Sequence, residues 1–207
     1  AAGGDFSARA GNTLALNAAA IDTAGSASLD ARRITSSVVV LRNTEVNSQE
    51  SGLYGWFMNG QHETLDHAES IGSSIIAGGN ISLLALDTTG TAHATASDTT
   101  ATTSPLPGID LTSITLSGQD ILLASTGNVR IVSAYDQHLD DRHNTARTRV
   151  NSQSSQLTRA SRIEGDSIRV AGAHVVIDAT DLLATGSLHL AAAGNLSLGA
   201  NTDLRDQ

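Results

Sequence analysis

The sequence predicts an all-β protein, a parallel β-helix (β-solenoid) with β excursions extruded along one side. Three observations lead to this fold class. A glycine turn followed by alternating apolar residues recurs along the chain, the spacing of these turns is periodic, and polar insertions interrupt the period. No segment keeps the i, i+3, i+4 apolar pattern of an amphipathic helix over several turns, so helices are not expected.

The recurring element is a glycine, often followed by Asn or Asp, and then a short strand. Alternating apolar residues bury one face of such a strand, and we expect Gly-Asn and Gly-Asp to accept the positive φ of a tight turn. The segments that match this pattern, each a glycine turn with its strand, are 11–16, 79–83, 127–131, 165–170, 186–190 and 194–198.

The spacing of the turns indicates a coiled chain. From Gly165 the turns follow at Gly172, Gly186 and Gly194, in steps of 7, 14 and 8 residues, so the pattern closes in 21 to 22 residues. That length is typical of one rung of a parallel β-helix. Hydrophobic residues make up 40% of the chain and aromatic residues only 2%. The predicted core is therefore narrow and filled by Ala, Val, Ile and Leu.

Three polar segments interrupt the 14-residue step, at about 42–70, 88–113 and 136–161. The first and third share Val-Asn-Ser-Gln, at 46–49 and 150–153, and are therefore copies of one excursion. We expect all three to leave the rung at one fixed place and to stack along one side as extra strands or hairpins. Residues 1–207 are predicted to form a single β-helix segment of a longer protein, because repeat-like sequence runs to both ends without a polar cap.

The chain resembles a known family at this point. Residues 73–85, a Ser/Thr-rich excursion and residues 116–124 are similar to the haemagglutinin repeats of filamentous-haemagglutinin-like exoproteins. The resemblance covers about 11–198 and implies a right-handed parallel β-helix within a very long protein exported by two-partner secretion. Such proteins include adhesins and the stalks of contact-dependent growth-inhibition effectors. The Asn-Pro motifs of the family's secretion domain have no counterpart, since neither Pro105 nor Pro107 follows an Asn.

Composition excludes several function classes. The formal net charge is -9, with twelve basic residues, all Arg and scattered, so nucleic acid is not an expected partner. The absence of cysteine excludes disulfides and cysteine-based zinc sites. No cofactor is expected.

Two histidine pairs raise the possibility of metal binding. His62 and His67 are five residues apart, as are His138 and His143, and acidic residues lie beside both pairs. A five-residue gap puts two side chains on opposite faces of a strand. The favoured interpretation is a solvated excursion, and no metal ligand is assigned.

Tyr54, Trp56, Phe57 and Met58 form the main aromatic cluster, inside the first excursion and flanked by glycines. Exposed aromatic residues mark contact sites, so this segment is the candidate contact loop. The alternative, that the cluster folds back over the side of the core, is favoured slightly.

A carbohydrate-active enzyme is the rival function, since right-handed β-helices include polysaccharide lyases and hydrolases. Catalysis would need carboxylates from successive rungs in one groove. The available candidates, Asp136, Asp140 and Asp141 with Arg130 and Arg169, make a poor constellation, and no catalytic residue is assigned.

The leading hypothesis is a structural and adhesive shaft, not an enzyme, of a large secreted protein displayed on the bacterial cell surface. Its expected partners are a protein or glycan receptor on a host or neighbouring bacterial cell, and an outer-membrane secretion partner for the parent protein. The excursions would supply the contacts and the core would supply stiffness.

Overall fold

The computed structural model describes residues 3–51, 59–87, 106–144, 149–200 and 204–206. This part of the chain is built from strands β1 to β20 and contains no helix, so the prediction of an all-β fold is confirmed. It therefore contains no helix long and apolar enough to cross a membrane. Contacts divide the chain into two compact units. One comprises 1–39, 72–133 and 160–200, and the other comprises 40–71, 134–159 and 201–207.

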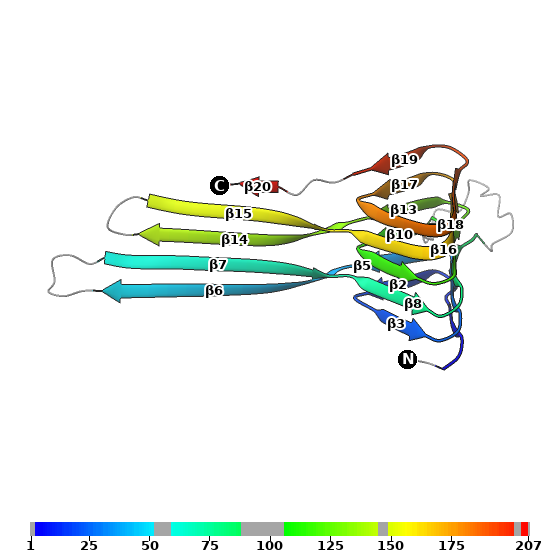
Figure 1. The fold of residues 1–207 in the computed structure, drawn as a ribbon, viewed down its shortest axis with the longest axis horizontal. Coiled ribbons are helices and arrows are strands. Elements are labelled where there is room, and N and C mark those ends of the chain that lie inside the picture. The colour runs from blue at the N-terminus through cyan, green and yellow to red at the C-terminus, as the bar shows by residue number, and fades with distance from the viewer. Residues whose placement is uncertain (1–2, 52–58, 88–105, 145–148, 201–203, 207) are drawn as a thin grey trace, which may run out of the picture. The chain divides into compact units, whose positions relative to one another are not determined.

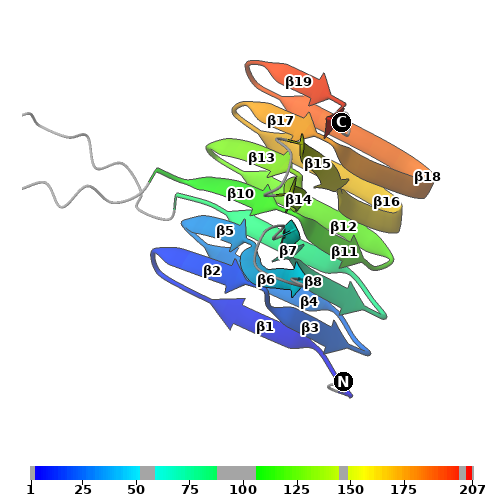
Figure 2. The same ribbon diagram turned by 90° about the vertical axis from the view of Figure 1, so that its left-hand side faces the viewer.

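The first unit, which we call the stacked unit, consists of parallel strands in three stacks (Figures 1 and 2). Stack 1 contains β2 (Thr13–Asn17), β5 (Arg33–Ser37), β10 (Gly108–Thr112), β13 (Asn128–Val132), β17 (Val175–Asp178) and β19 (Leu196–Gly199). Stack 2 contains β3 (Ala20–Thr23), β8 (Ser73–Ala77), β11 (Ile114–Ser117) and the first halves of β16 (Ser161–Gly172) and β18 (Thr180–Ala192). Stack 3 contains β1 (Phe6–Arg9), β4 (Ala27–Ala31), β9 (Ile81–Ala85), β12 (Asp120–Ser125) and the second halves of β16 and β18.

The chain visits the stacks in a fixed order, and we call three consecutive strand segments, one for each stack, a rung. Rungs 1 to 5 begin with β2, β5, β10, β13 and β17. Where nothing is inserted, paired residues of adjacent rungs are 19 to 21 positions apart, as in Ser161↔Thr180, Leu14↔Ile34 and Val175↔Leu196. The predicted period of 21 to 22 residues was therefore slightly too long.

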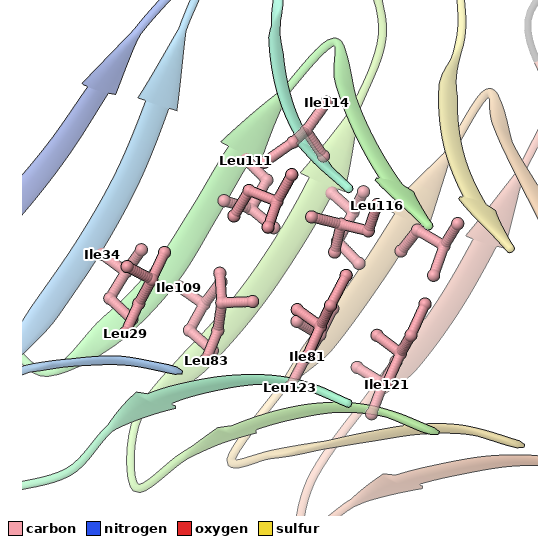
Figure 3. Packing of buried hydrophobic residues seen from close by; sticks show 14 of the residues in the cluster. Leu29, Ile34, Ile81, Leu83, Ile109, Leu111, Ile114, Leu116, Ile121 and Leu123 are labelled. Carbon is pink, nitrogen blue, oxygen red and sulfur yellow. The ribbon is translucent and has the colours of Figure 1, made fainter. Parts of the chain in front are cut away.

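The core lies between the three stacks and is filled by aliphatic side chains, as Figure 3 shows. Equivalent residues lie above one another, so that Ile75, Leu116 and Ile163 form one ladder and are each 0% exposed. Leu29, Leu83 and Leu123 form a second ladder. Burying an Ile or Leu side chain contributes roughly 1.5–3 kcal/mol. Repetition of this burial from rung to rung stabilises the stack.

The corners between strands correct one prediction about glycine. No described glycine has a left-handed φ. Glycine is instead required by close approach, since a Cβ at Gly127 would overlap the carbonyl oxygen of Pro107 in the adjacent rung. The left-handed conformations belong to Ala18, Ser113 and Ala179, with φ of 48°, 48° and 45°. All three lie at the corner between stacks 1 and 2.

The predicted excursions differ from the observed ones in extent and position. The first and third are hairpins, formed by β6 (Val39–Ser51) with β7 (Asn59–Ile71) and by β14 (Ala134–Asn144) with β15 (Arg149–Arg159). Both leave the corner between stacks 1 and 2. The second departs between β9 and β10, at the corner between stacks 3 and 1, so a single fixed place of insertion was wrong. It also ends earlier than Ser113, because residues 108–112 form β10.

Candidate functional site: the hairpin sheet

The second unit is an antiparallel sheet that we call the hairpin sheet. Its strand order is β20-β15-β14-β7-β6, with β20 formed by Leu204–Asp206. The long strands of the two hairpins run side by side in Figure 1. The hairpins are joined by eight residue pairs between β14 and β7, from Gln137↔Ala68 to Asn144↔Gln61. Segments about 70 residues apart in sequence therefore form one continuous surface.

The hairpins leave alternate rungs of the stacked unit. At the corner between stacks 1 and 2, rungs 1, 3 and 5 turn through the single left-handed residues Ala18, Ser113 and Ala179, whereas rungs 2 and 4 extend into hairpins. The strand β20, which follows β19, pairs with β15 through Ser154↔Asp206 and two further pairs. Since β19 begins a sixth rung, β20 takes the position that an outgoing hairpin strand has in rungs 2 and 4. The alternation of plain rungs and hairpin rungs therefore continues.

Both faces of the hairpin sheet carry accessible side chains. Among the residues whose side chains are described, Ala68, Ser70 and Ala134 are buried and the rest are half-buried or exposed. Leu139 and Leu157 are 38% and 46% exposed, and on the edge strand β6 Val46 is 58% exposed. A sheet normally buries at least one face to gain stability. A sheet without a buried face is available for contact with another molecule.

Ion pairs across the strands set the register of this sheet. The Arg142 Nε lies 2.9 Å from Glu63 Oε1 on β7 and 3.3 Å from Asp140 Oδ1 on its own strand. Further along the same face, Arg159 lies 3.4 Å from Glu69 Oε1 and 3.7 Å from Asp136 Oδ2. Exposed pairs contribute only about 0–1 kcal/mol each. Their main effect is to disfavour a slipped register, because a shift of one residue would move each charge to the opposite face.

The backbone of the first hairpin is fastened to the second by a serine and an aspartate. The Ser70 backbone N–H donates to Asp136 Oδ1 at 2.7 Å, and the Ser70 hydroxyl donates to the Tyr135 carbonyl oxygen at 2.8 Å. Asp136 therefore accepts one charge-assisted hydrogen bond and also faces Arg159. Asp136, a candidate for catalysis, is therefore engaged in contacts that hold the two hairpins together.

The other candidates for catalysis are dispersed over both units, and two of them form ion pairs. Asp140 pairs with Arg142, and on the stacked unit Arg130 Nη1 lies 3.0 Å from Asp110 Oδ1. Asp141 lies on the opposite face of β14 from Asp140, because side chains alternate along a strand. Arg169 is exposed on β16, beside Leu122 and His189 of the adjacent rungs.

The histidines are arranged in a way that sequence reasoning missed. His62 and His67 lie five residues apart on β7, and His138 and His143 lie five residues apart on β14. However, the register pairs His138 with His67 and His143 with His62 across the two hairpins. The rings of His67 and His138 are in edge contact, with centroids 5.5 Å apart and planes inclined at 68°. No sequence signal gives this pairing, since it depends on which strands become neighbours.

The predicted contact loop, Tyr54, Trp56, Phe57 and Met58, lies outside the described residues. Within the described ranges, no group of three or more His, Cys, Asp or Glu side chains is arranged to hold a metal ion.

Comparisons with known proteins give no relatives. No protein-family model, curated protein or solved structure matches this chain.

Proposed function

We propose that the chain is a segment of a right-handed parallel β-helix that serves as a shaft and displays the hairpin sheet for contact with another surface. The stacks of parallel strands and the repeated Ile and Leu ladders support the β-helix assignment. The right hand is supported by the strong preference of parallel crossover connections for that hand.

The observation that carries this proposal is the two-sided accessibility of the hairpin sheet. Long hairpins recur at one corner of alternate rungs and pair with each other, yet they bury few side chains within the described ranges. The stack already closes that corner with one or two residues in rungs 1, 3 and 5. Such hairpins are dispensable for closing a rung, and their role is therefore recognition.

The parent protein is, on this proposal, secreted and displayed at a bacterial cell surface, with export through an outer-membrane partner. The resemblance of residues 73–85 and 116–124 to haemagglutinin repeats supports this placement. The partner of the hairpin sheet would be a protein or glycan receptor on a host cell or a neighbouring bacterium.

Internal deletions test the contact role without disturbing the rungs. Removing residues 38–71 deletes the first hairpin and joins Ser37 to Gly72. The register of β5 with β2 and of β8 with β3 then puts Gly72 at the place that Ala18 occupies in rung 1. Glycine accepts the left-handed φ of that corner, whereas a junction at the β-branched Val38 would be strained.

The second hairpin is deleted by removing residues 134–160. This joins Ser133 to Ser161 and reproduces the Ser113-Ile114 corner of rung 3, again with the strands in register. A serine already adopts the left-handed conformation at that corner. A third variant replaces 54–58 by Gly and Ser and separates the loop from the sheet.

Fluorescently labelled protein is measured on epithelial and bacterial cells by flow cytometry, and each variant's fold is checked by circular dichroism. We expect the intact chain to bind one of these cell types and the double deletion to lose most of that binding while keeping its β-sheet spectrum. If the double deletion binds as well as the intact chain, the hairpin sheet does not make the contact. Absence of binding by the intact chain to all cells tested would contradict the function itself.

A further inference from the structure

We propose that His67 and His138 form a binding site for a late first-row divalent metal ion such as Zn²⁺, which clasps the two hairpins together. His67 belongs to β7, which returns to rung 2, and His138 belongs to β14, which leaves rung 4. The two residues stand directly opposite each other in the register. Neutral imidazole is a preferred ligand of Zn²⁺, Cu²⁺ and Ni²⁺.

The spacing of the rings fits one shared metal ion. A Zn–N bond of about 2.1 Å puts each ring centroid about 3.2 Å from the metal, and a tetrahedral angle then separates the centroids by about 5.2 Å. The observed separation of the centroids is 5.5 Å. Both side chains are exposed, so rotation about their side-chain torsions can turn a nitrogen of each ring toward the shared position.

Carboxylates and arginines lie on the same face of the sheet as the two histidines. Strand alternation places four carboxylates, from Asp136, Asp140, Glu63 and Glu69, on the face of the two histidines. Two arginines, Arg142 and Arg159, partly neutralise them. Arg149 and Arg205 also occupy register positions of this face, so its charges are nearly balanced and do not by themselves attract a cation.

The protein supplies two ligands to this site, and water completes the coordination sphere. Two imidazoles and water make an open site, unlike a closed structural zinc centre with four protein ligands. The consequence is mechanical. A metal ion held by both imidazoles can be bound only while β7 and β14 are paired, so it stabilises that pairing by linkage.

The test is Zn²⁺ binding to the full chain by isothermal titration calorimetry. Since the register also pairs His62 with His143, the background is the variant His62→Gln/His143→Gln, which isolates the proposed site. We expect one Zn²⁺ per chain in this background. Adding His67→Gln or His138→Gln should weaken binding by about tenfold or more, since even the loss of an outer-sphere partner costs 10–100-fold. The matched control is His189→Gln, an exposed histidine of the stacked unit, which should bind as the background does.

Hydrogen exchange supplies a second readout that does not depend on the calorimetric signal. Some amides of β7 and β14 exchange only when the two hairpins separate. At a free Zn²⁺ concentration of 100 times the Kd, these amides should exchange up to about 100-fold more slowly than without Zn²⁺. The protection should disappear in the His67→Gln variant. No Zn²⁺ binding in the background, undiminished binding after His67→Gln, or an equal loss after His189→Gln would each overturn the assignment.

Discussion

Replacing Ser73 by alanine removes a buried hydroxyl that serves two backbone groups of the adjacent rung. Ser73 is 2% exposed, its Oγ accepts from the Ala19 backbone N–H at 3.1 Å and donates to the Leu16 carbonyl oxygen at 3.2 Å. These groups flank the left-handed corner at Ala18, where the regular ladder is interrupted. Each of the two groups left without a partner costs about 1–3 kcal/mol, so the variant should lose about 2–6 kcal/mol in the free energy of unfolding.

Urea denaturation followed by circular dichroism measures this loss. With a slope of about 2 kcal/mol per molar, a loss of 3 kcal/mol lowers the midpoint by about 1.5 M. The neighbouring Ser74, half-buried on the other side of β8, provides the matched control, and Ser74→Ala should change stability by less than about 0.5 kcal/mol. Equal effects of the two substitutions would refute the reasoning. Ser161→Ala repeats the test two rungs further, since Ser161 Oγ bonds to Ile114 N–H and the Val132 carbonyl oxygen.

Two further substitutions address the core and the corner. Ile75→Ala should lower the free energy of unfolding by about 2–5 kcal/mol, because the Ile75 side chain is 0% exposed. The control Ile76→Ala should lower it by less than about 1 kcal/mol, because Ile76 is 46% exposed. Equal urea midpoints for the two variants would argue against the core ladder. Ala18→Gly should stabilise the chain slightly, since left-handed φ costs a non-glycine residue about 1–2 kcal/mol and the entropy cost of glycine is about 0.4–1 kcal/mol. The control Ala19→Gly should instead lower the melting temperature. A lower melting temperature for Ala18→Gly as well would contradict the left-handed corner.

The strands of the stacked unit could be predicted because their signal is local. An apolar residue at every second position after a glycine marks an inward-facing ladder, as at Ile81 and Leu83. The corners could not be predicted in the same way. Glycine was expected to provide the left-handed turns, but Ala18 adopts that conformation. At position 127 glycine is required because the adjacent rung lies too close for a Cβ, and this proximity cannot be read from the sequence.

The hairpins were only partly predictable for a related reason. The first and third excursions both form hairpins, and strand pairing brings these into one sheet. Their shared Val-Asn-Ser-Gln lies on the outgoing strand β6 at 46–49 but on the returning strand β15 at 150–153, so the tetrapeptide does not mark equivalent positions. The segment 88–113 has a similar composition but departs from another corner, because composition carries no information about position within a rung. The contact between His67 and His138 depends on the order of the hairpins and required the structure.

The alternation of hairpins with corners of one or two residues makes two rungs, not one, the step by which such a chain can grow or shrink. Strands lie about 4.8 Å apart within any sheet, so two rungs lengthen a stack by about the same amount as one hairpin widens its own sheet. Loss of one plain rung would put hairpins on consecutive rungs and break the alternation seen in rungs 1 to 5. Gene duplications and deletions in proteins built on this plan should therefore be tolerated in even numbers of rungs.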